Sequence, residues 1–381
     1  MNRLVIIGNG FDLAHGLKTK YEDFFYWYWV QRINGLPSTI VRESKDPLCT
    51  IKTEYISFPI TLDYCHDILY GDNKTRYNNL IQHSINKELS IDCFVLLNRI
   101  KDRVWSKSWL DIENEYYSCL LDEMGKIELE KCADFKGLNE QMACLTKLLT
   151  EYLKIQEKNI IPFYIDLKEE LNKPFKRDEL STSSIPYKNF KGEPKPPKKI
   201  LLLNFNYTNT PERYIDNESR SKIIYIHGKL EEEKSIIFGY GDEWDDDYVR
   251  LKKLNDNECL RNMKSYRYLE SNNYRSVMNF IESDYFQVSI MGHSCGTSDG
   301  TLLRKLFEHP NCVSIKPYLY VDEKGKDSYF DLSCNISRHF SDPSQMRDKL
   351  VEKTSCKELP CKEIMENYYE VVKQKNRDLM I

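Results

Sequence analysis

Short, mostly apolar runs that end abruptly in polar residues recur along the chain. They lie at residues 4–7, 200–203, 223–226, 286–291 and 313–321. Runs of this length, apolar throughout rather than at alternate positions, are typical of strands buried on both faces of a parallel sheet. The pattern predicts an α/β fold built on such a sheet. A similar run at 235–238 is expected to add a strand, and residues 331–340 to form a last one.

Helical periodicity dominates the segment between the first two runs. The aromatic residues of the first expected helix recur at helical spacing and predict that it faces a core: Phe24, Phe25, Tyr28 and Trp29. Residues 36–75 show no clear period. Further helices are expected at about 76–102, 108–130, 139–171 and, as a pair, 343–377.

The order of these segments predicts how the chain is divided. Residues 173–199 are rich in proline, serine and charge, which indicates a loop that returns the chain to the sheet. We expect a core made of residues 1–20 and 198–381. A mainly helical insertion, residues 21–197, would follow the first strand and end in this Pro/Lys-rich loop.

Composition narrows the class of protein. The chain has 55 basic and 59 acidic residues in 381, so nothing indicates a nucleic-acid surface. The first apolar run is too short for a signal peptide, and no run approaches the roughly 18 residues of a membrane span. A cytoplasmic protein is therefore expected. The twelve cysteines are scattered without a CxxC pair, which favours free thiols and no metal site.

Candidate chemistry lies just after the strands, where ligands bind in open parallel sheets. Asn206 follows the second apolar run and His227 the third, so both are predicted at the mouth of one crevice. The first run opens into Gly8-Asn9-Gly10, a turn that can aim backbone N–H groups at a phosphate. Leu13 replaces the third glycine of the dinucleotide fingerprint, so a simple tight turn remains an alternative. A backbone-bonded His227 and a turn-forming Asn206 are the corresponding alternatives.

Two acidic clusters have structural interpretations. In WSKSWLDIENEY, which contains Trp105 and Trp109, we expect Asp111 to cap a helix and Glu113 to be surface charge. The acidic run at 243–247 is expected to be a solvated loop rather than a metal site.

The segment Gly292-His293-Ser294-Cys295-Gly296 also matches the G-x-S-x-G elbow of serine hydrolases. Ser294 would be the nucleophile, and the remaining triad members would be His339 with Asp322 or Asp331. This alternative leaves Asn206 and His227 without a role.

Several short motifs occur together in a distinctive order: IIGNGFDLAHGLKTKY, WLDIE, NFNYTNT, IHG, IFGYGDE and GHSCGTSD. In wording and order they resemble the AbiH family of bacterial abortive-infection proteins. More remotely, the glycine turn, the asparagine motif, the H-G and the late G-x-S resemble the sirtuin-like NAD-binding fold. The resemblance implies a Rossmann-like sheet and NAD, or a related nucleotide, as substrate or ligand.

The resemblance also assigns roles to residues. It implies that Asn206 orients the nicotinamide ribose and that His227 acts on the ribose hydroxyls, both as catalytic residues. Three positions depart from the sirtuin-like pattern, because alanine, serine and aspartate are replaced by Asn9, Asp12 and Thr208. The residues implied to bind the nucleotide are Gly8, Asn9, Gly10, Phe11, Asp12, Tyr207, Gly292, Ser294 and Asp299.

The expected function is that of an anti-phage effector that cleaves NAD at its N-glycosidic bond. The alternatives are a nucleotide-sensing module without catalysis and the serine hydrolase described above. The expected partners are a small-molecule nucleotide and a phage-derived trigger or defence protein, with a homo-oligomer left open. Neither a membrane nor a specific nucleic acid is expected to bind.

Overall fold

The computed structural model of the chain describes most of its residues. They are 1–34, 42–53, 90–104, 111–159, 161–191, 193–215 and 220–362. The expected helix at 76–89, Trp105, Trp109 and most of residues 36–75 lie outside the described residues.

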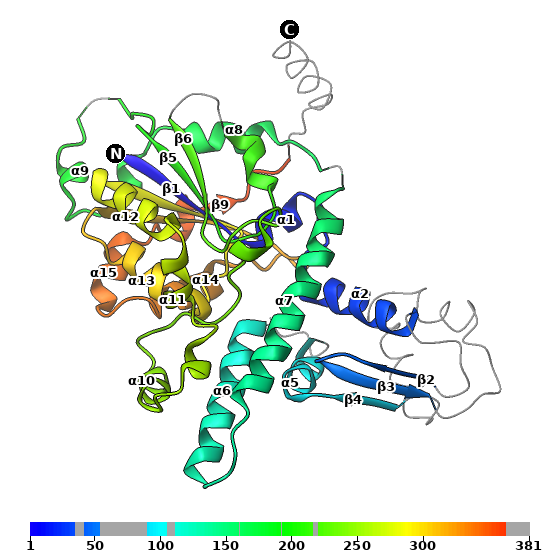
Figure 1. Cartoon of the computed structure of the whole chain (residues 1–381). Helices are drawn as coiled ribbons and strands as arrows, with labels where there is room; N and C mark the ends of the chain where they lie inside the picture. Colours follow the sequence, from blue (N-terminus) through cyan, green and yellow to red (C-terminus); the bar gives the residue numbers. More distant parts are fainter. Residues whose placement is uncertain are drawn as a thin grey trace. The chain divides into compact units, whose positions relative to one another are not determined.

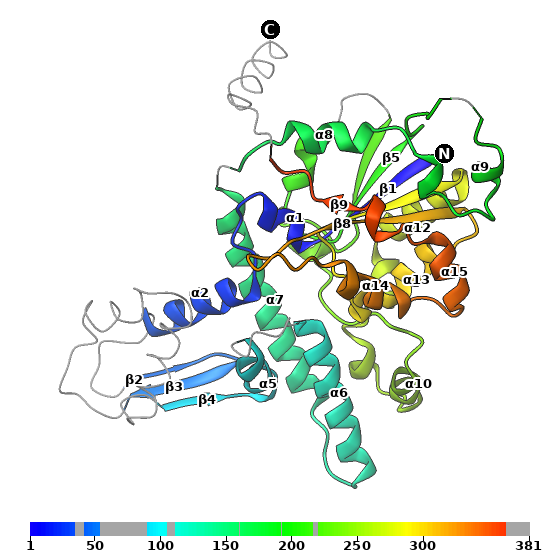
Figure 2. The same cartoon turned by 180° about the vertical axis from the view of Figure 1, so that it is seen from behind.

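The main sheet has six parallel strands in the order β6-β5-β1-β7-β8-β9. Strands β6, β5 and β1 are labelled in Figure 1, and β8 and β9 are labelled in the view from behind in Figure 2. Their bounds are β1 Asn2–Ile7, β5 Ile200–Asn204, β6 Ser221–Tyr225, β7 Phe286–Met291, β8 Cys312–Leu319 and β9 Lys357–Glu358. The α/β class and the parallel sheet predicted from the apolar runs are confirmed.

Helices cover both faces of this sheet. Successive β1 residues alternate between two apolar clusters, with Leu4 in one and Val5 in the other. The Leu4 cluster includes buried residues of α12 Asn273–Ser283, α13 Gly300–Phe307 and α14 Tyr329–Ser337. The Val5 cluster includes residues of α1 Asn9–Ala14 and α8 Ile165–Asn172. Because every side chain of β1 is buried, the strand needs an apolar sequence without alternation.

The chain divides into two compact units. The first contains the six-stranded sheet and comprises residues 1–18, 156–237 and 267–381. The second comprises residues 19–155 and 238–266. Compared with the expected division, residues 156–197 group with the sheet, and residues 238–266 group with the insertion.

The second unit is not purely helical. Besides helices it contains a three-stranded antiparallel sheet in the order β2-β3-β4, which the sequence reading missed. The aromatic residues expected to face a core on α2 are all buried. The elements of this unit are α2 Tyr21–Asn34, β2 Arg42–Lys45, β3 Cys49–Thr53, β4 Ser90–Cys93, α5 Val95–Val104, α6 Ile112–Glu128, α7 Phe135–Glu157 and α10 Asp246–Lys253.

Two predicted strands are wrong. Residues 235–238 form the end of a 3-10 turn, Glu233–Ser235, and then a buried segment outside any strand. Residues 331–340 belong largely to α14 and the turn after it. Leu332, Ile336 and Phe340 are buried at intervals of four residues, a helical period that the strand prediction overlooked.

Three helix predictions need correction. The helix expected at 139–171 is two helices, α7 and α8, and Pro162, which cannot donate a backbone hydrogen bond, lies between them. The helix expected up to residue 102 begins only at Val95, after strand β4. Of the pair expected at 343–377, one is α15 Pro343–Lys349, which ends earlier than expected because a 3-10 turn and β9 follow it, and residues 363–377 lie outside the described residues.

Each acidic cluster contains an aspartate that caps a helix. Asp111 caps α6 as predicted, because its carboxylate accepts the N–H groups of Glu113 and Asn114. Glu113 is buried rather than surface charge. Asp245 caps α10, so the run at 243–247 leads into a helix instead of forming only a loop.

Of the helices described, none is both long and apolar enough to cross a bilayer.

Candidate functional site

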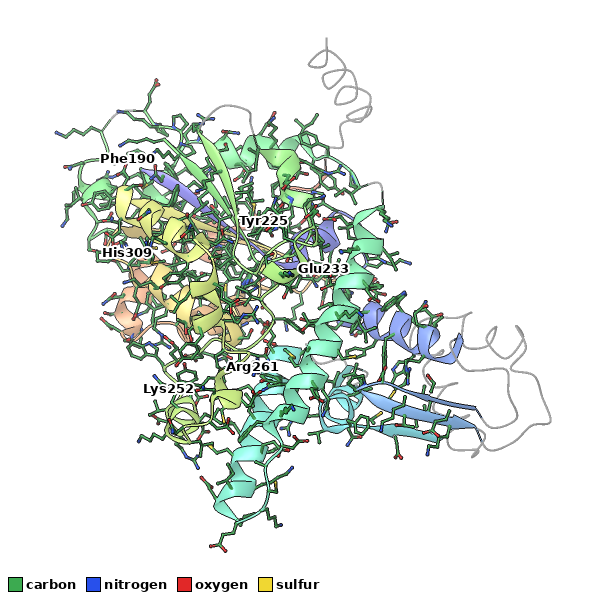
Figure 3. All side chains as sticks on the ribbon, viewed as in Figure 1. Phe190, Tyr225, Glu233, Lys252, Arg261 and His309 are labelled. Carbon is green, nitrogen blue, oxygen red and sulfur yellow. The ribbon has the colours of Figure 1, made fainter. Side chains whose placement is uncertain are left out.

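The carboxyl ends of four strands meet at one edge of the sheet. The register places Ile7 of β1 opposite both Asn204 of β5 and Met291 of β7, and Asn204 opposite Tyr225 of β6. Because the strands are parallel, the polar segments that follow them start at the same edge. Figure 3 labels Tyr225, which ends β6 two residues before His227. The structure thus brings together the four segments that the sequence singled out.

The glycine turn after β1 interlocks with the loop after β7. Gly8 donates its N–H to Met291 (3.2 Å) and Gly10 to Gly292 (2.8 Å). A Cβ on Gly8 would lie 2.6 Å from the Cα of His293, and Gly292 has a φ of 75°. These glycines therefore allow two backbones to touch, which agrees with the tight-turn alternative. Phosphate binding by Gly8, Gly10 and Gly292 remains a prediction.

The substitution Gly8→Ala tests this interlock. We expect it to destabilise the protein by about 1–3 kcal/mol, because the added methyl overlaps the backbone of His293. Thermal unfolding measures the effect. Gly125→Ala in α6, where a Cβ would meet nothing within 4 Å, is the control and should leave the melting temperature unchanged or slightly raised. Equal melting of Gly8→Ala and wild type would contradict the interlock.

Asn206 joins the loop after β5 to the glycine turn. Its Nδ2 donates to the carbonyl of Gly8 (3.0 Å). The loop itself is shaped by Asn204, whose Oδ1 accepts the N–H of Asn206 (3.1 Å) and whose Nδ2 donates to the carbonyl of Thr208 (3.0 Å). The turn-forming asparagine is therefore Asn204, which is completely buried. The alternative drawn from the sequence gives that role to Asn206 instead.

Two of the positions that depart from the sirtuin-like pattern are bonded to each other. Thr208 donates its hydroxyl to Oδ2 of Asp12 (2.6 Å). Burial raises the pKa of Asp12 from 3.8 to about 6, and the Thr208 hydroxyl opposes that rise. The other carboxylate oxygen of Asp12, Oδ1, is buried and has no hydrogen-bond partner among the described residues.

This raised pKa makes the stability contribution of Asp12 depend on pH. The folded protein holds the Asp12 proton up to about pH 6, whereas the unfolded chain releases it near 3.8. Stability conferred by Asp12 is therefore full below pH 3.8 and is lost as the pH rises through 6, by about 3 kcal/mol for this pKa difference. The melting temperature of wild type relative to Asp12→Asn should fall across that window. In Thr208→Val the fall should extend to higher pH, and an unchanged midpoint would contradict the assignment.

A carboxylate bridges two histidines beside these loops. Oδ1 of Asp299 lies 3.2 Å from Nε2 of His227, and Oδ2 lies 3.4 Å from Nε2 of His293. All three side chains are more than nine-tenths buried. We call His227, Asp299 and His293 the bridged cluster.

Hydrogen bonding fixes the tautomer of His293. Its Nδ1 accepts the N–H of Cys295 (2.9 Å), so the ring proton is on Nε2. That nitrogen lies 3.4 Å from Oδ2 of Asp299. His293 therefore places a polar N–H group beside the carboxylate.

The same reasoning fixes a proton on one ring nitrogen of His227. Its Nδ1 lies 3.2 Å from the carbonyl of Phe205, which can only accept, so this nitrogen carries a proton. Its Nε2 faces both the carboxylate of Asp299 and the hydroxyl of Tyr268 (3.3 Å). Nε2 can accept the proton of the Tyr268 hydroxyl or share a proton with Oδ1 of Asp299. Such a pair can give up or take back a proton, as acid–base chemistry requires.

The remaining predicted residues have simpler surroundings. Tyr207 is half-buried and donates its hydroxyl to the carbonyl of Ile237 (3.0 Å). Asn9 is half-buried at the start of α1, whereas the ring of Phe11 is buried in the core against Tyr214. Phe11 therefore contributes packing, and nucleotide binding by Asn9 and Tyr207 remains a prediction.

The serine-hydrolase triad is not assembled. His339 bonds the backbone carbonyl of Cys295 (2.9 Å) through Nε2. Asp322 accepts backbone N–H groups of its own turn, and Asp331 is exposed beside Lys326. The positive φ that strains a nucleophile elbow falls on Cys295 (55°) rather than on Ser294, and burial raises the pKa of the Cys295 thiol. The G-x-S-x-G match thus has no triad geometry behind it.

Three residues of this edge were missed as site residues: Asn204, Tyr268 and His293. His293 lies two residues after the end of β7, just as His227 lies two residues after the end of β6. The G-x-S-x-G match directed the prediction to Ser294 instead. Asn204 is the last residue of an apolar strand, where a polar side chain needs a dedicated partner. Nothing in the sequence marks Tyr268, which comes from a distant 3-10 turn.

The fold and site define an α/β protein with a parallel sheet whose carboxyl edge carries a buried His–Asp–His cluster. The family model described as bacteriophage abortive infection AbiH matches residues 4–320. The chain belongs to the AbiH family, as the motifs predicted. No curated protein and no solved structure matches it. Within the described residues no group of three or more histidine, cysteine, aspartate or glutamate side chains could hold a metal ion.

Proposed function

We propose that the protein is an anti-phage abortive-infection effector that cleaves NAD, or a related nucleotide, at the N-glycosidic bond. The observation that carries this proposal is the bridged cluster, with Asp299 between His227 and His293 at the carboxyl edge of the sheet. The family supports the defence role. The NAD chemistry rests on the cluster and on the resemblance of the strand-end motifs to sirtuin-like proteins.

The charges favour the nicotinamide-ribose half of NAD. Asp299 and Asp12 place carboxyl groups beside the loops, and these attract the cationic nicotinamide ring but repel phosphates. The N–H groups of Gly8 and Gly10 are already bonded within the protein. The pyrophosphate of NAD would therefore have to be bound by groups other than these two N–H groups.

The chemistry required of this site is modest. Nicotinamide leaves as a neutral molecule from a cationic ring, so its departure needs no acid. The ribose then carries oxocarbenium-like positive charge, which a fixed carboxylate such as Asp299 stabilises. With Nε2 unprotonated, His227 beside Asp299 is a base for the attacking water. Asn206, held by Gly8, would orient the ribose.

One observation favours the second candidate, a nucleotide-sensing module without catalysis. Both ring nitrogens of His227 and both oxygens of Asp299 have partners within the protein. A catalytic base needs at least one nitrogen turned toward the substrate. The sensing role would need only the loops around the cluster.

NAD measurement in infected cells separates the two candidates. Cells expressing wild type, His227→Ala or the surface control Asp331→Asn are infected, and NAD and nicotinamide are followed by chromatography. We expect NAD to fall and nicotinamide to rise with wild type and the control, but not with His227→Ala. Protection with a constant NAD pool would overturn NAD cleavage and favour the sensing module. Infection supplies whatever trigger the protein requires.

A further inference from the structure

Two cysteines face each other across the antiparallel sheet of the second unit. Cys49 on the central strand β3 is in register with Cys93 on β4. Residues directly opposite in such a sheet project from the same face, with Cβ atoms about 4.5–5.5 Å apart. Neither cysteine is in a disulfide. No other two of the described cysteines are paired in a strand register.

The backbone hydrogen bonds show which kind of pair this is. Phe94 donates its N–H to the carbonyl of Leu48 (2.9 Å), so the adjacent pair is hydrogen-bonded. The carbonyl of Cys49 instead accepts the N–H of Asp46, on the β2 side. Because the two kinds of pair alternate, Cys49 and Cys93 form a non-hydrogen-bonded pair, with Cα atoms about 4.5 Å apart. Disulfides span roughly 4.4–6.8 Å between Cα atoms.

We propose that Cys49 and Cys93 form a dithiol site that a small-molecule disulfide of the glutathione type oxidises to a cross-strand disulfide. The strand register already supplies the spacing, so the backbone need not move. A rotation about χ1 of each cysteine brings the two sulfur atoms together.

The surroundings give the two thiols different tasks. Cys49 is buried, burial raises the pKa of its thiol, and its sulfur lies 3.1 Å from the hydroxyl of Tyr28. Cys93 is half-buried between the exposed residues Asp92 and Phe94. An external disulfide therefore reaches Cys93 first, and Cys49 acts as the resolving thiol.

The reaction balances in two exchange steps. The thiolate of Cys93 attacks one sulfur of the reagent, which forms a mixed disulfide and releases one thiolate. The thiolate of Cys49 then attacks the sulfur of Cys93 and releases the second. The protein loses two electrons and two protons, and the reagent is reduced to two thiols. The new bond closes a covalent loop between residues 49 and 93, which restricts the unfolded chain and should raise the melting temperature.

Peptide mapping of the full-length chain tests the proposal. Reduced protein is incubated with oxidised glutathione, quenched with acid, alkylated and digested for mass spectrometry. We expect a Cys49–Cys93 linked peptide, a higher melting temperature than that of the reduced protein, and reversal of both by dithiothreitol. Cys93→Ser should show neither effect, whereas Cys132→Ser, which removes an exposed cysteine, should show both.

Two results would overturn the proposal. One is glutathione on Cys132 while Cys49 and Cys93 remain open to alkylation, which would show that the pair does not react. The other is a Cys93 that stops at the mixed disulfide or links to a different cysteine. If Cys93→Ser unfolds, Cys93→Ala replaces it, and the wild-type peptide map decides the question without any variant.

Discussion

Replacing Asp299 with asparagine should lower phage protection and NAD cleavage by on the order of a hundredfold or more while the protein stays folded. Asparagine has the shape of aspartate, and its Oδ1 can still accept from His293 while its Nδ2 donates to His227. Polar contacts with both histidines survive, but the negative charge disappears. The melting temperature should therefore move by only a few degrees.

The measurement is paired, with thermal unfolding beside phage plating and nicotinamide release. Asp331→Asn is the matched control, because it removes an exposed carboxylate whose contact with Lys326 is 3.5 Å long. It should behave as wild type in every assay. A folded Asp299→Asn variant that still protects fully would show that the bridged cluster is structural.

Replacing Lys264 with methionine should destabilise the second unit by about 3–5 kcal/mol. Lys264 is completely buried, and its ammonium group donates to Oε2 of Glu113 (2.7 Å). Oε1 of Glu113 accepts the N–H of Gly239 (3.0 Å). Without the lysine, the buried Glu113 carboxylate loses the ammonium group that faces it, and the melting temperature should fall by on the order of 10 °C.

Two further variants identify the cause of that loss. Lys326→Met removes an exposed lysine and should leave the melting temperature unchanged, because exposed ion pairs contribute little. Adding Glu113→Gln to Lys264→Met should recover most of the lost stability, because glutamine keeps the acceptor for Gly239 without a charge. If the double variant is no more stable than Lys264→Met, lost packing rather than the unpaired charge causes the effect.

The sequence predicted the sheet well, because burial on both faces imposes unbroken apolar runs such as Leu4–Ile7. The strand prediction failed where a buried apolar segment does not pair with a neighbouring strand. Phe238, for example, is buried but lies outside any strand. The short strands β2, β3 and β4 escaped because segments such as Arg42–Lys45 are polar and give no apolar run.

The candidate site was predicted in part. The strand-end rule placed Asn206 and His227 at one edge, and the Nδ1 of His227 does contact the carbonyl of Phe205, the residue before Asn206. The contact between Asp299 and His293 depends on how the segment after β7 folds. No residue spacing in the sequence encodes that conformation. Because Asn206 and His227 are buried and bonded, alanine at either position should also cost about 1–3 kcal/mol of stability, more than polar groups at an open crevice mouth would cost.

The second unit is made of two stretches of chain, and this affects the order in which the protein can fold on the ribosome. Glu113 and Lys264 are 151 positions apart, with strands β5 and β6 of the first unit encoded between them. A nascent chain that has just completed α7 contains Glu113 but neither Gly239 nor Lys264. The unit therefore lacks these two partners of its buried carboxylate until residues 238–266 have been synthesised. Products that end before residue 266 should be unstable in that unit and open to proteolysis, so only chains that extend past this residue would accumulate in the cell.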